Sequence, residues 1–171
     1  MKIKKKDIIS YLGIIVAVVL IRTFLITPVK VDGTSMNPTL KNNDILILKK
    51  YDKKIERFDI VVIDYKKSKL VKRVIGLPGE KIKITTTRVG NEYVSAIYIN
   101  GEKLEENYGM EPIKEDGLAH EEITLKSDEY FVLGDNRNNS SDSRIIGPVK
   151  LKDIKGTTTT RIIPKFGKID K

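Results

Sequence analysis

The chain has 171 residues, enough for one domain with a proper hydrophobic core and too few for two large ones. Its 40% apolar and 32% charged residues are typical of a folded protein, which excludes a disordered chain. Because the sequence has no Cys and a single His, thiol catalysis, cysteine-based zinc sites and HExxH sites are also excluded.

The formal net charge of +9 is unevenly distributed. Nearly half of the excess belongs to the first 27 residues, and the other bases are scattered among acids. Nucleic-acid binding is the usual alternative for a basic protein, but the sequence has no RNP-like or helix-turn-helix pattern. We therefore expect no nucleic-acid partner. Attraction to anionic lipid or wall polymer agrees better with the charge.

An apolar segment near the N-terminus has the length of a membrane span. Residues 8–20 are almost uninterrupted, and after Arg22 the apolar residues resume over 24–26 before Pro28 ends the helix. The roughly 20 residues that a bilayer core requires are nearly reached, and Arg22 lies where it can extend to the far interface. A cleaved signal peptide and a buried core helix are the alternatives. The first lacks a small-x-small site here, and the one-sided basic flank disfavours the second.

Four lysines precede this segment: Lys2, Lys4, Lys5 and Lys6. By the positive-inside rule they place the N-terminus in the cytoplasm and the rest of the chain outside. We therefore predict a basic tail and signal anchor over 1–27, in the cell membrane, and an extracytoplasmic domain over 28–171.

Short runs rich in β-branched residues follow, separated by Gly, Pro and Asn. They predict strands over these residues: 44–49, 60–63, 69–75, 82–89, 93–99, 129–133 and 157–160. Asn100-Gly101 favours a type I′ turn, so 93–99 and 103–104 are expected to pair. The sequence thus predicts a mainly β fold of coiled antiparallel sheets or a partial barrel.

A smaller inserted hairpin is expected over about 81–125. Within it, residues 105–122 are acidic, contain Gly and Pro, and show no clear period. This pattern predicts a mobile surface excursion from the β-rich core.

Ser35 lies in the segment GTSMNPTL, which opens at Gly33. In one interpretation this is an ordinary turn, with Ser35 bonded locally and Met36 filling the core. In the other, Gly33 lets the backbone bend close to a substrate and presents the Ser35 hydroxyl as a nucleophile. Such a nucleophile needs a base, which leaves Lys, a carboxylate or the single His120.

Lys72 and Arg73 lie inside the aliphatic run LVKRVIG. Strand alternation sends them to opposite faces, so one of them is directed at the core. Burial can lower a lysine pKa by two or three units from about 10.4, which makes the amine a usable general base at neutral pH. The alternative is a solvated lysine at a strand edge.

The segment GDNRNNSSDSR, residues 134–144, follows a predicted strand and is dense in polar turn formers. Its hydroxyls could orient a neutral lysine, and its carboxylates could pair with arginines. Its oxygen ligands also suit calcium, but the spacing differs from the EF-hand pattern and two arginines are present, so we predict no metal.

The order of these features resembles the type I signal peptidases, membrane-bound Ser-Lys proteases that remove signal peptides from exported proteins. An anchor is followed by SMxPTL, KRxxGxPGE and GDNRxxSxDSR, and the resemblance extends from the anchor to residues 147–149. The short stretch between the second and third motifs is similar to the compact Gram-positive form. The resemblance implies cleavage after small-x-small sites without a cofactor, and secretory preproteins and the lipid bilayer as partners.

By this resemblance, Ser35 is the acylating nucleophile and Lys72 its general base. Ser140 corresponds to the hydroxyl that hydrogen-bonds and positions the lysine amine. Two ion pairs are implied: Asp142 with Arg144, and Asp135 with Arg73.

The resemblance also implies how the substrate binds. It is expected to add as a β-strand, with shallow pockets for small residues walled by Val29, Val31 and Val71. Met36 is expected beside them, and apolar residues around it are expected to reach the lipid surface. The Ser35 N–H corresponds to one oxyanion-hole donor. Some members supply the second with a serine two positions earlier, where this chain has Gly33.

Two other functions compete. A self-cleaving Ser-Lys protease of the repressor type shares the dyad but carries a DNA-binding domain in place of an anchor. An inactive relative acting as a scaffold agrees with Gly33 alone, since both dyad residues are present. His120 lies in the acidic excursion beside no motif, and we expect it to be solvated. The sequence makes no prediction of oligomeric state.

Overall fold

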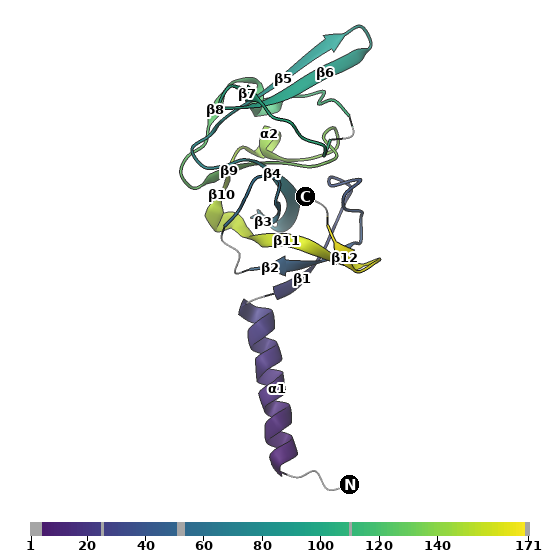
Figure 1. The fold of residues 1–171 in the computed structure, drawn as a ribbon, viewed down its shortest axis with the longest axis vertical. Coiled ribbons are helices and arrows are strands. Elements are labelled where there is room, and N and C mark those ends of the chain that lie inside the picture. The colour runs from purple at the N-terminus through teal and green to yellow at the C-terminus, as the bar shows by residue number, and fades with distance from the viewer. Residues whose placement is uncertain (1–4, 25, 51–53, 110, 170–171) are drawn as a thin grey trace.

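The structure is a computed structural model that describes residues 5–24, 26–50, 54–109 and 111–169. The side chains of residues 5, 21–24 and 26 also lie outside the description, so the predicted roles of Lys2, Lys4, Lys5 and Arg22 fall there. Figure 1 shows one long helix projecting from the end of a β-rich domain that contains two sheets.

The larger sheet is antiparallel and has the strand order β1-β2-β11-β3-β4-β9-β10, with β12 paired to β11. Its strands are β1 (Ile26–Lys30), β2 (Ile45–Lys49), β3 (Ile60–Tyr65), β4 (Ser68–Gly76), β9 (Glu129–Leu133), β10 (Val149–Lys150), β11 (Ile154–Ile163) and β12 (Gly167–Lys168). β1 forms one edge, since it pairs only with β2.

The smaller sheet lies at the end of the domain opposite the long helix (Figure 1). Its order is β7-β6-β5-β8, from β5 (Lys81–Val89), β6 (Glu92–Ile99), β7 (Glu102–Lys103) and β8 (Ile123–Thr124). Asn100 and Gly101 both have positive φ, 52° and 86°, as a type I′ turn requires, and Tyr98 pairs with Lys103 across it. This hairpin and every predicted strand are present, with boundary shifts of a few residues.

The helices are few: α1 (Lys5–Phe24), α2 (Ser143–Ile146), and the 3-10 turns η1 (Gly117–His120) and η2 (Leu151–Asp153). Across the part of the chain that the structure describes, none of the helices is both long and apolar enough to cross a bilayer.

The core is divided into three clusters of buried aliphatic side chains. β3 contributes to two of them, because Ile60 and Val62 face one cluster and Val61 and Ile63 face another. β4 is likewise buried on both faces from Val71 to Gly76. A central strand covered on both sides is where a charged side chain can be held out of water.

Residues 105–109 and 111–122 make several contacts with the rest of the domain, and the mobility expected of this segment stays a prediction. Ile113 and Ala119 are buried in the cluster beneath the smaller sheet. The Ile113 N–H donates to Ser95 Oγ at 2.8 Å, and Arg137 donates to both oxygens of Glu106. Sequence periodicity could not reveal these contacts, because most of them are made by single side chains to distant residues.

Candidate active site

Ser35 lies in a tight turn between β1 and β2. Gly33 has a φ of +93°, a value that favours glycine, and Asn37 N–H then donates to the Thr34 carbonyl at 3.0 Å. Leu40 N–H donates to the Met36 carbonyl at 2.9 Å. The turn thereby leaves the Ser35 side chain half-buried, where a neighbouring side chain and a substrate can both reach it.

The loop over 134–142 holds this turn from the other side. Asn136 N–H donates to the Ser35 carbonyl at 3.0 Å, and its side-chain amide donates to the Thr34 carbonyl at 3.3 Å. Asn139 donates to the Thr34 hydroxyl at 3.1 Å. Segments about 100 residues apart in the sequence are therefore joined directly at Ser35.

Lys72 meets Ser35 from β4. Its Nζ lies 2.7 Å from Ser35 Oγ and 3.0 Å from the Val71 carbonyl oxygen, within hydrogen-bond distance of both. Lys72 is 2% exposed and Arg73 is fully buried, so both neighbours are inside the protein although they face opposite sides of the strand. The expectation that one of the two faces the core was too narrow, because β4 is covered on both faces.

Burial lowers the pKa of Lys72 from 10.5 to about 8, because the charged ammonium loses its hydration. The carboxylates of Asp142 and Asp135 oppose this shift by favouring the charged form. With a pKa of about 8, roughly a tenth of the molecules carry a neutral amine at pH 7. That fraction is hundreds of times larger than for a solvated lysine.

Both implied ion pairs are present beside the dyad. Arg73 donates from Nε and Nη2 to the two oxygens of Asp135, at 2.9 and 2.8 Å, with both side chains at most 1% exposed. Arg144 binds Asp142 in the same bidentate manner, at 2.9 Å for each contact. Asp142 also caps the short helix α2 by accepting from the Arg144 N–H. These carboxylates are therefore engaged by arginines, and no cluster of metal ligands is found among the described residues.

Ser140 is half-buried close to Ser35, and its buried hydroxyl oxygen makes no hydrogen bond within the described part of the chain. A Cβ placed on Gly134 would lie 2.2 Å from Ser140 Oγ and 2.5 Å from the Ser35 carbonyl oxygen. Glycine at 134 is thus what lets the two serines approach. The expected bond from Ser140 to the Lys72 amine is not made in this structure, and its orienting role stays a prediction.

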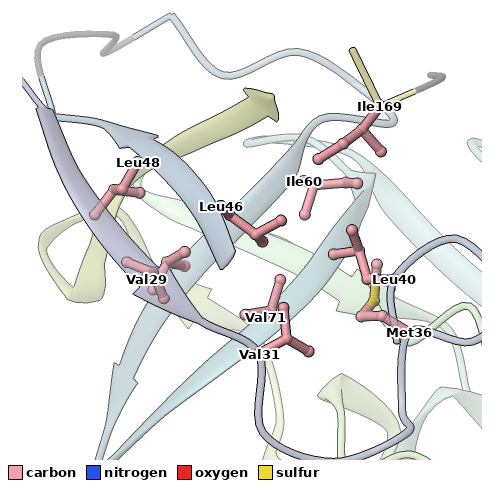
Figure 2. Packing of buried hydrophobic residues seen from close by; sticks show 10 residues of the cluster. Val29, Val31, Met36, Leu40, Leu46, Leu48, Ile60, Val71 and Ile169 are labelled. Atoms are coloured by element: carbon pink, nitrogen blue, oxygen red, sulfur yellow. The ribbon is translucent and has the colours of Figure 1, made fainter. Parts of the chain in front are cut away.

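The four apolar residues expected at the substrate lie in one core cluster (Figure 2). Val29, Val31 and Val71 are between 3 and 8% exposed. Met36 is 1% exposed and packs in the same cluster, as expected if it fills the core beneath the Ser35 turn. The sequence alone could not tell whether an apolar residue near Ser35 faces the core or the surface.

The backbone N–H groups of Gly33 and Ser35 differ in whether they donate a hydrogen bond. The Gly33 N–H donates to Asn42 Oδ1 at 3.0 Å. Among the hydrogen bonds of the described residues, none uses the N–H of Ser35. The sequence analysis did not predict one side-chain contact near the site: the Thr39 hydroxyl donates to Asp135 Oδ2 at 2.6 Å. His120 has a side chain that is 71% exposed and contacts Asp116.

Comparison with known proteins shows the family of the chain. A sequence model of the family described as "Signal peptidase, peptidase S26" matches residues 5–163. Signal peptidase I S of Bacillus subtilis is 38% identical over 91% of this chain and 89% of its own length. Signal peptidase I of Bacillus caldolyticus is 40% identical over 84% of this chain and 83% of its own.

A solved structure was also matched. The crystal structure of a signal peptidase I from Enterococcus faecalis is 31% identical, with a TM-score of 0.43 over 61% of this chain and 96% of that chain. On the strength of the family model and the Bacillus relatives, the chain belongs to the signal peptidase family, peptidase S26, and is a hydrolase of the serine peptidase type.

Proposed function

We propose that this chain removes signal peptides from exported preproteins with Ser35 as nucleophile and Lys72 as general base. The observation that carries the proposal is the 2.7 Å separation of Lys72 Nζ and Ser35 Oγ, in a site that lowers the lysine pKa to about 8. Removal of signal peptides is supported by the names of the Bacillus relatives, which are signal peptidases I.

In the first step the neutral amine takes the Ser35 proton as Oγ attacks the scissile carbonyl carbon. The resulting ammonium then gives a proton to the departing amine of the mature chain. In the second step Lys72 takes a proton from water as the water oxygen attacks the ester carbonyl carbon. The ammonium then returns a proton to Ser35 Oγ as its bond to the acyl carbon breaks, which restores the hydroxyl. No cofactor or metal enters either step.

The Ser35 N–H serves as one donor to the developing oxyanion, which its freedom from other hydrogen bonds supports. Gly33 contributes no hydroxyl, and its N–H is engaged by Asn42. Ser140 orients the Lys72 amine, which its buried and unpartnered hydroxyl supports. The pairs of Arg73 with Asp135 and Arg144 with Asp142 hold the loop and β4 in register around the dyad.

The substrate adds as a strand along the free edge of β1, with small side chains at the first and third positions before the cut. Val29, Val31 and Val71 line the shallow pockets for these side chains. Their burial in one close-packed cluster supports a preference for alanine-sized residues, since a packed cluster has little volume to give a larger one.

Membrane attachment through α1 completes the proposal, with the N-terminus cytoplasmic and the domain over 28–171 outside. Large apolar side chains from Ile8 to Leu20 are 49–70% exposed, and residues of the β domain do not cover them. Enzyme and preprotein then share two dimensions, which raises their effective concentration.

The test is cleavage of a preprotein with an Ala-x-Ala site by the detergent-solubilised full chain, beside Ser35→Ala and Lys72→Ala. We expect both variants to lose at least about a thousandfold in kcat, as is typical for removal of a nucleophile or its base. Lys69→Ala is the matched control, because Lys69 lies on the same strand and pairs with Asp64 with its side chain 57% exposed. Cleavage by both dyad variants at the parental rate would refute the assignment.

A further inference from the structure

The guanidinium next to the proposed base is sealed from water by an aromatic ring. Arg73 binds both oxygens of Asp135 and donates from Nη1 to the Phe58 carbonyl at 2.9 Å. The ring of Tyr108 covers one face of the guanidinium, with Arg73 Cζ 3.6 Å from the ring centroid. Tyr108 also packs against the Phe58 ring at 5.1 Å. An arginine over a tyrosine face at this distance is a cation–π contact.

This sealed ion pair is joined to both members of the dyad. Arg73 follows Lys72 directly on β4. Asp135 accepts from the Thr39 hydroxyl at 2.6 Å, in the same turn as Ser35. The next residue, Asn136, donates its N–H to the Ser35 carbonyl at 3.0 Å. The position of Ser35 relative to Lys72 therefore depends on the geometry of the Arg73–Asp135 pair.

Tyr108 comes from a segment outside the larger sheet. We call this segment, residues 104–109 and 111–116, the strap. The strap follows β7 of the smaller sheet and is hydrogen-bonded to the loop over 134–142 at two further residues. Arg137 Nη2 donates to Glu106 Oε2 at 2.7 Å, and Asn138 Nδ2 donates to the Pro112 carbonyl at 3.0 Å. The smaller sheet thus delivers an aromatic ring to the back of the site and anchors it on both sides.

From these contacts we propose that Tyr108 is a positioning residue of the peptidase: its ring holds the Arg73–Asp135 pair dry and fixed, and so keeps Lys72 and Ser35 in contact. The inference rests on the proposed function of the dyad. Tyr108 acts through Arg73, the residue its ring covers.

The charges that face Lys72 decide what loss of the ring does. They are Asp135 from the loop and Asp142 at the start of α2, each held by its arginine, Arg73 or Arg144. If the ring is removed, water reaches the Arg73–Asp135 pair and the arginine neutralises Asp135 less tightly. Both hydration and a less compensated Asp135 favour the charged lysine. The active neutral amine then forms only at higher pH.

The experiment compares Tyr108→Phe and Tyr108→Leu in the full chain, with Tyr93→Leu on the β5–β6 hairpin as the matched control. Preprotein cleavage is measured from pH 6 to 10, together with thermal unfolding. We expect Tyr108→Phe, which keeps the ring face, to match the parent within about twofold. Tyr108→Leu should lose about tenfold in kcat/KM at pH 7 and shift the acid limb to higher pH.

Exchange of the Arg73 Nε–H with solvent, followed by NMR, is a readout that does not need activity. It should accelerate in Tyr108→Leu and not in Tyr108→Phe or Tyr93→Leu. If Tyr108→Leu proves too unstable to assay, Tyr108→His, which keeps a flat ring, should restore both the slow exchange and the acid limb.

Three results would overturn the inference. One is an unchanged acid limb in Tyr108→Leu, even with a lower melting temperature, since that marks a purely structural residue. Another is equal loss in Tyr108→Phe, which would assign the effect to the hydroxyl. The third is unchanged Arg73 exchange. Failure of the dyad itself would be seen separately, as activity in Ser35→Ala and Lys72→Ala whatever the Tyr108 variants do.

Discussion

Two adjacent basic residues on β4 are given different chemical states by their surroundings. Arg73 is matched by both oxygens of Asp135 and stays a fixed cation. Lys72 has no carboxylate within hydrogen-bond distance among the described residues, and its amine faces a hydroxyl and a carbonyl. Because the lysine has no direct counter-charge among the described residues, burial lowers its pKa to about 8.

The first prediction concerns the pH dependence of cleavage. In the proposed mechanism Lys72 must be neutral to accept the Ser35 proton. We therefore expect kcat/KM to rise about tenfold per pH unit below the lysine pKa and to level off above about 8. The profile is measured with a peptide substrate that has no titrating group between pH 6 and 10. A rate that stays constant from pH 6 to 9 would contradict a titrating lysine.

The second prediction concerns stability. Burial lowers the pKa of Lys72 from 10.5 in the unfolded chain to about 8 in the folded state. Below the unfolded pKa, the charged lysine therefore reduces the free energy of unfolding. Lys72→Met removes this penalty and should stabilise the protein at pH 7 by about 3 kcal/mol. The gain should be full below pH 8 and shrink as the pH rises from 8 to 10.5, because the parent then regains stability. Urea denaturation of both proteins at several pH values measures it, and a gain that does not vary with pH would disagree.

At the level of elements, the loop over 134–142 does more than any strand to assemble the site. It supplies partners for the Ser35 turn through Asn136 and Asn139, and for β4 through Asp135. Its close approach depends on Gly134, where a Cβ would meet the Ser35 backbone and the Ser140 side chain within 2.6 Å.

The third prediction is that Gly134→Ala lowers both stability and activity. The added methyl must displace Ser140 or the Ser35 backbone, and overpacking of this kind costs about 1–3 kcal/mol. Gly167→Ala is the control, since a Cβ there meets nothing within 4 Å. Thermal unfolding and preprotein cleavage are compared for the two variants. Equal behaviour would show that the loop moves aside freely.

The strands were predictable because each is a local run of β-branched residues bounded by turn formers, as at 82–89 and 93–99. The second of these ends at Asn100-Gly101, whose turn type follows from two residues alone. β1 was not predicted as a strand from Ile26, because its first residues continue an apolar helical run. The start of a strand can be predicted from local sequence only where the residue pattern changes at that point.

The site was predictable in its members and less so in its contacts. Ser35 and Lys72 stand out by motif, and the pairing of Arg73 with Asp135 follows from the same motifs. The roles of Thr39 and Tyr108 depend on which segments meet in space, which no local pattern records. Met36 was easier, because a core-filling side chain was one of the two interpretations of its segment and its side chain is buried.

At the scale of the whole molecule, helix α1 and the β domain differ in how far their large apolar side chains are covered. α1 projects from the end of the domain opposite the smaller sheet (Figure 1). Its large apolar side chains are as exposed as Val89 and Val94 at the tip of the β5–β6 hairpin, which are 61 and 60% exposed. Only the helix concentrates such residues over several consecutive turns.

The fourth prediction tests attachment with these two places as a matched pair. Val16→Glu with Val19→Glu should abolish co-sedimentation of the full chain with lipid vesicles, because carboxylates are costly in hydrocarbon. Val89→Glu with Val94→Glu should leave it unchanged. Both double variants should still cleave a soluble peptide, since neither touches the dyad. Vesicle binding that survives the helix substitutions would refute attachment through α1.

The short connection between α1 and β1 has a consequence for where cleavage occurs. α1 ends at Phe24 and β1 begins at Ile26, so a single residue separates the helix from the sheet edge proposed to receive the substrate. In the proposed membrane setting the sheet edge cannot swing far from the bilayer surface. In that setting the distance of the cleavage site from the bilayer surface becomes part of substrate selection. Membrane-bound polypeptides are then cut where their small residues lie at the distance of the β1 edge from the bilayer.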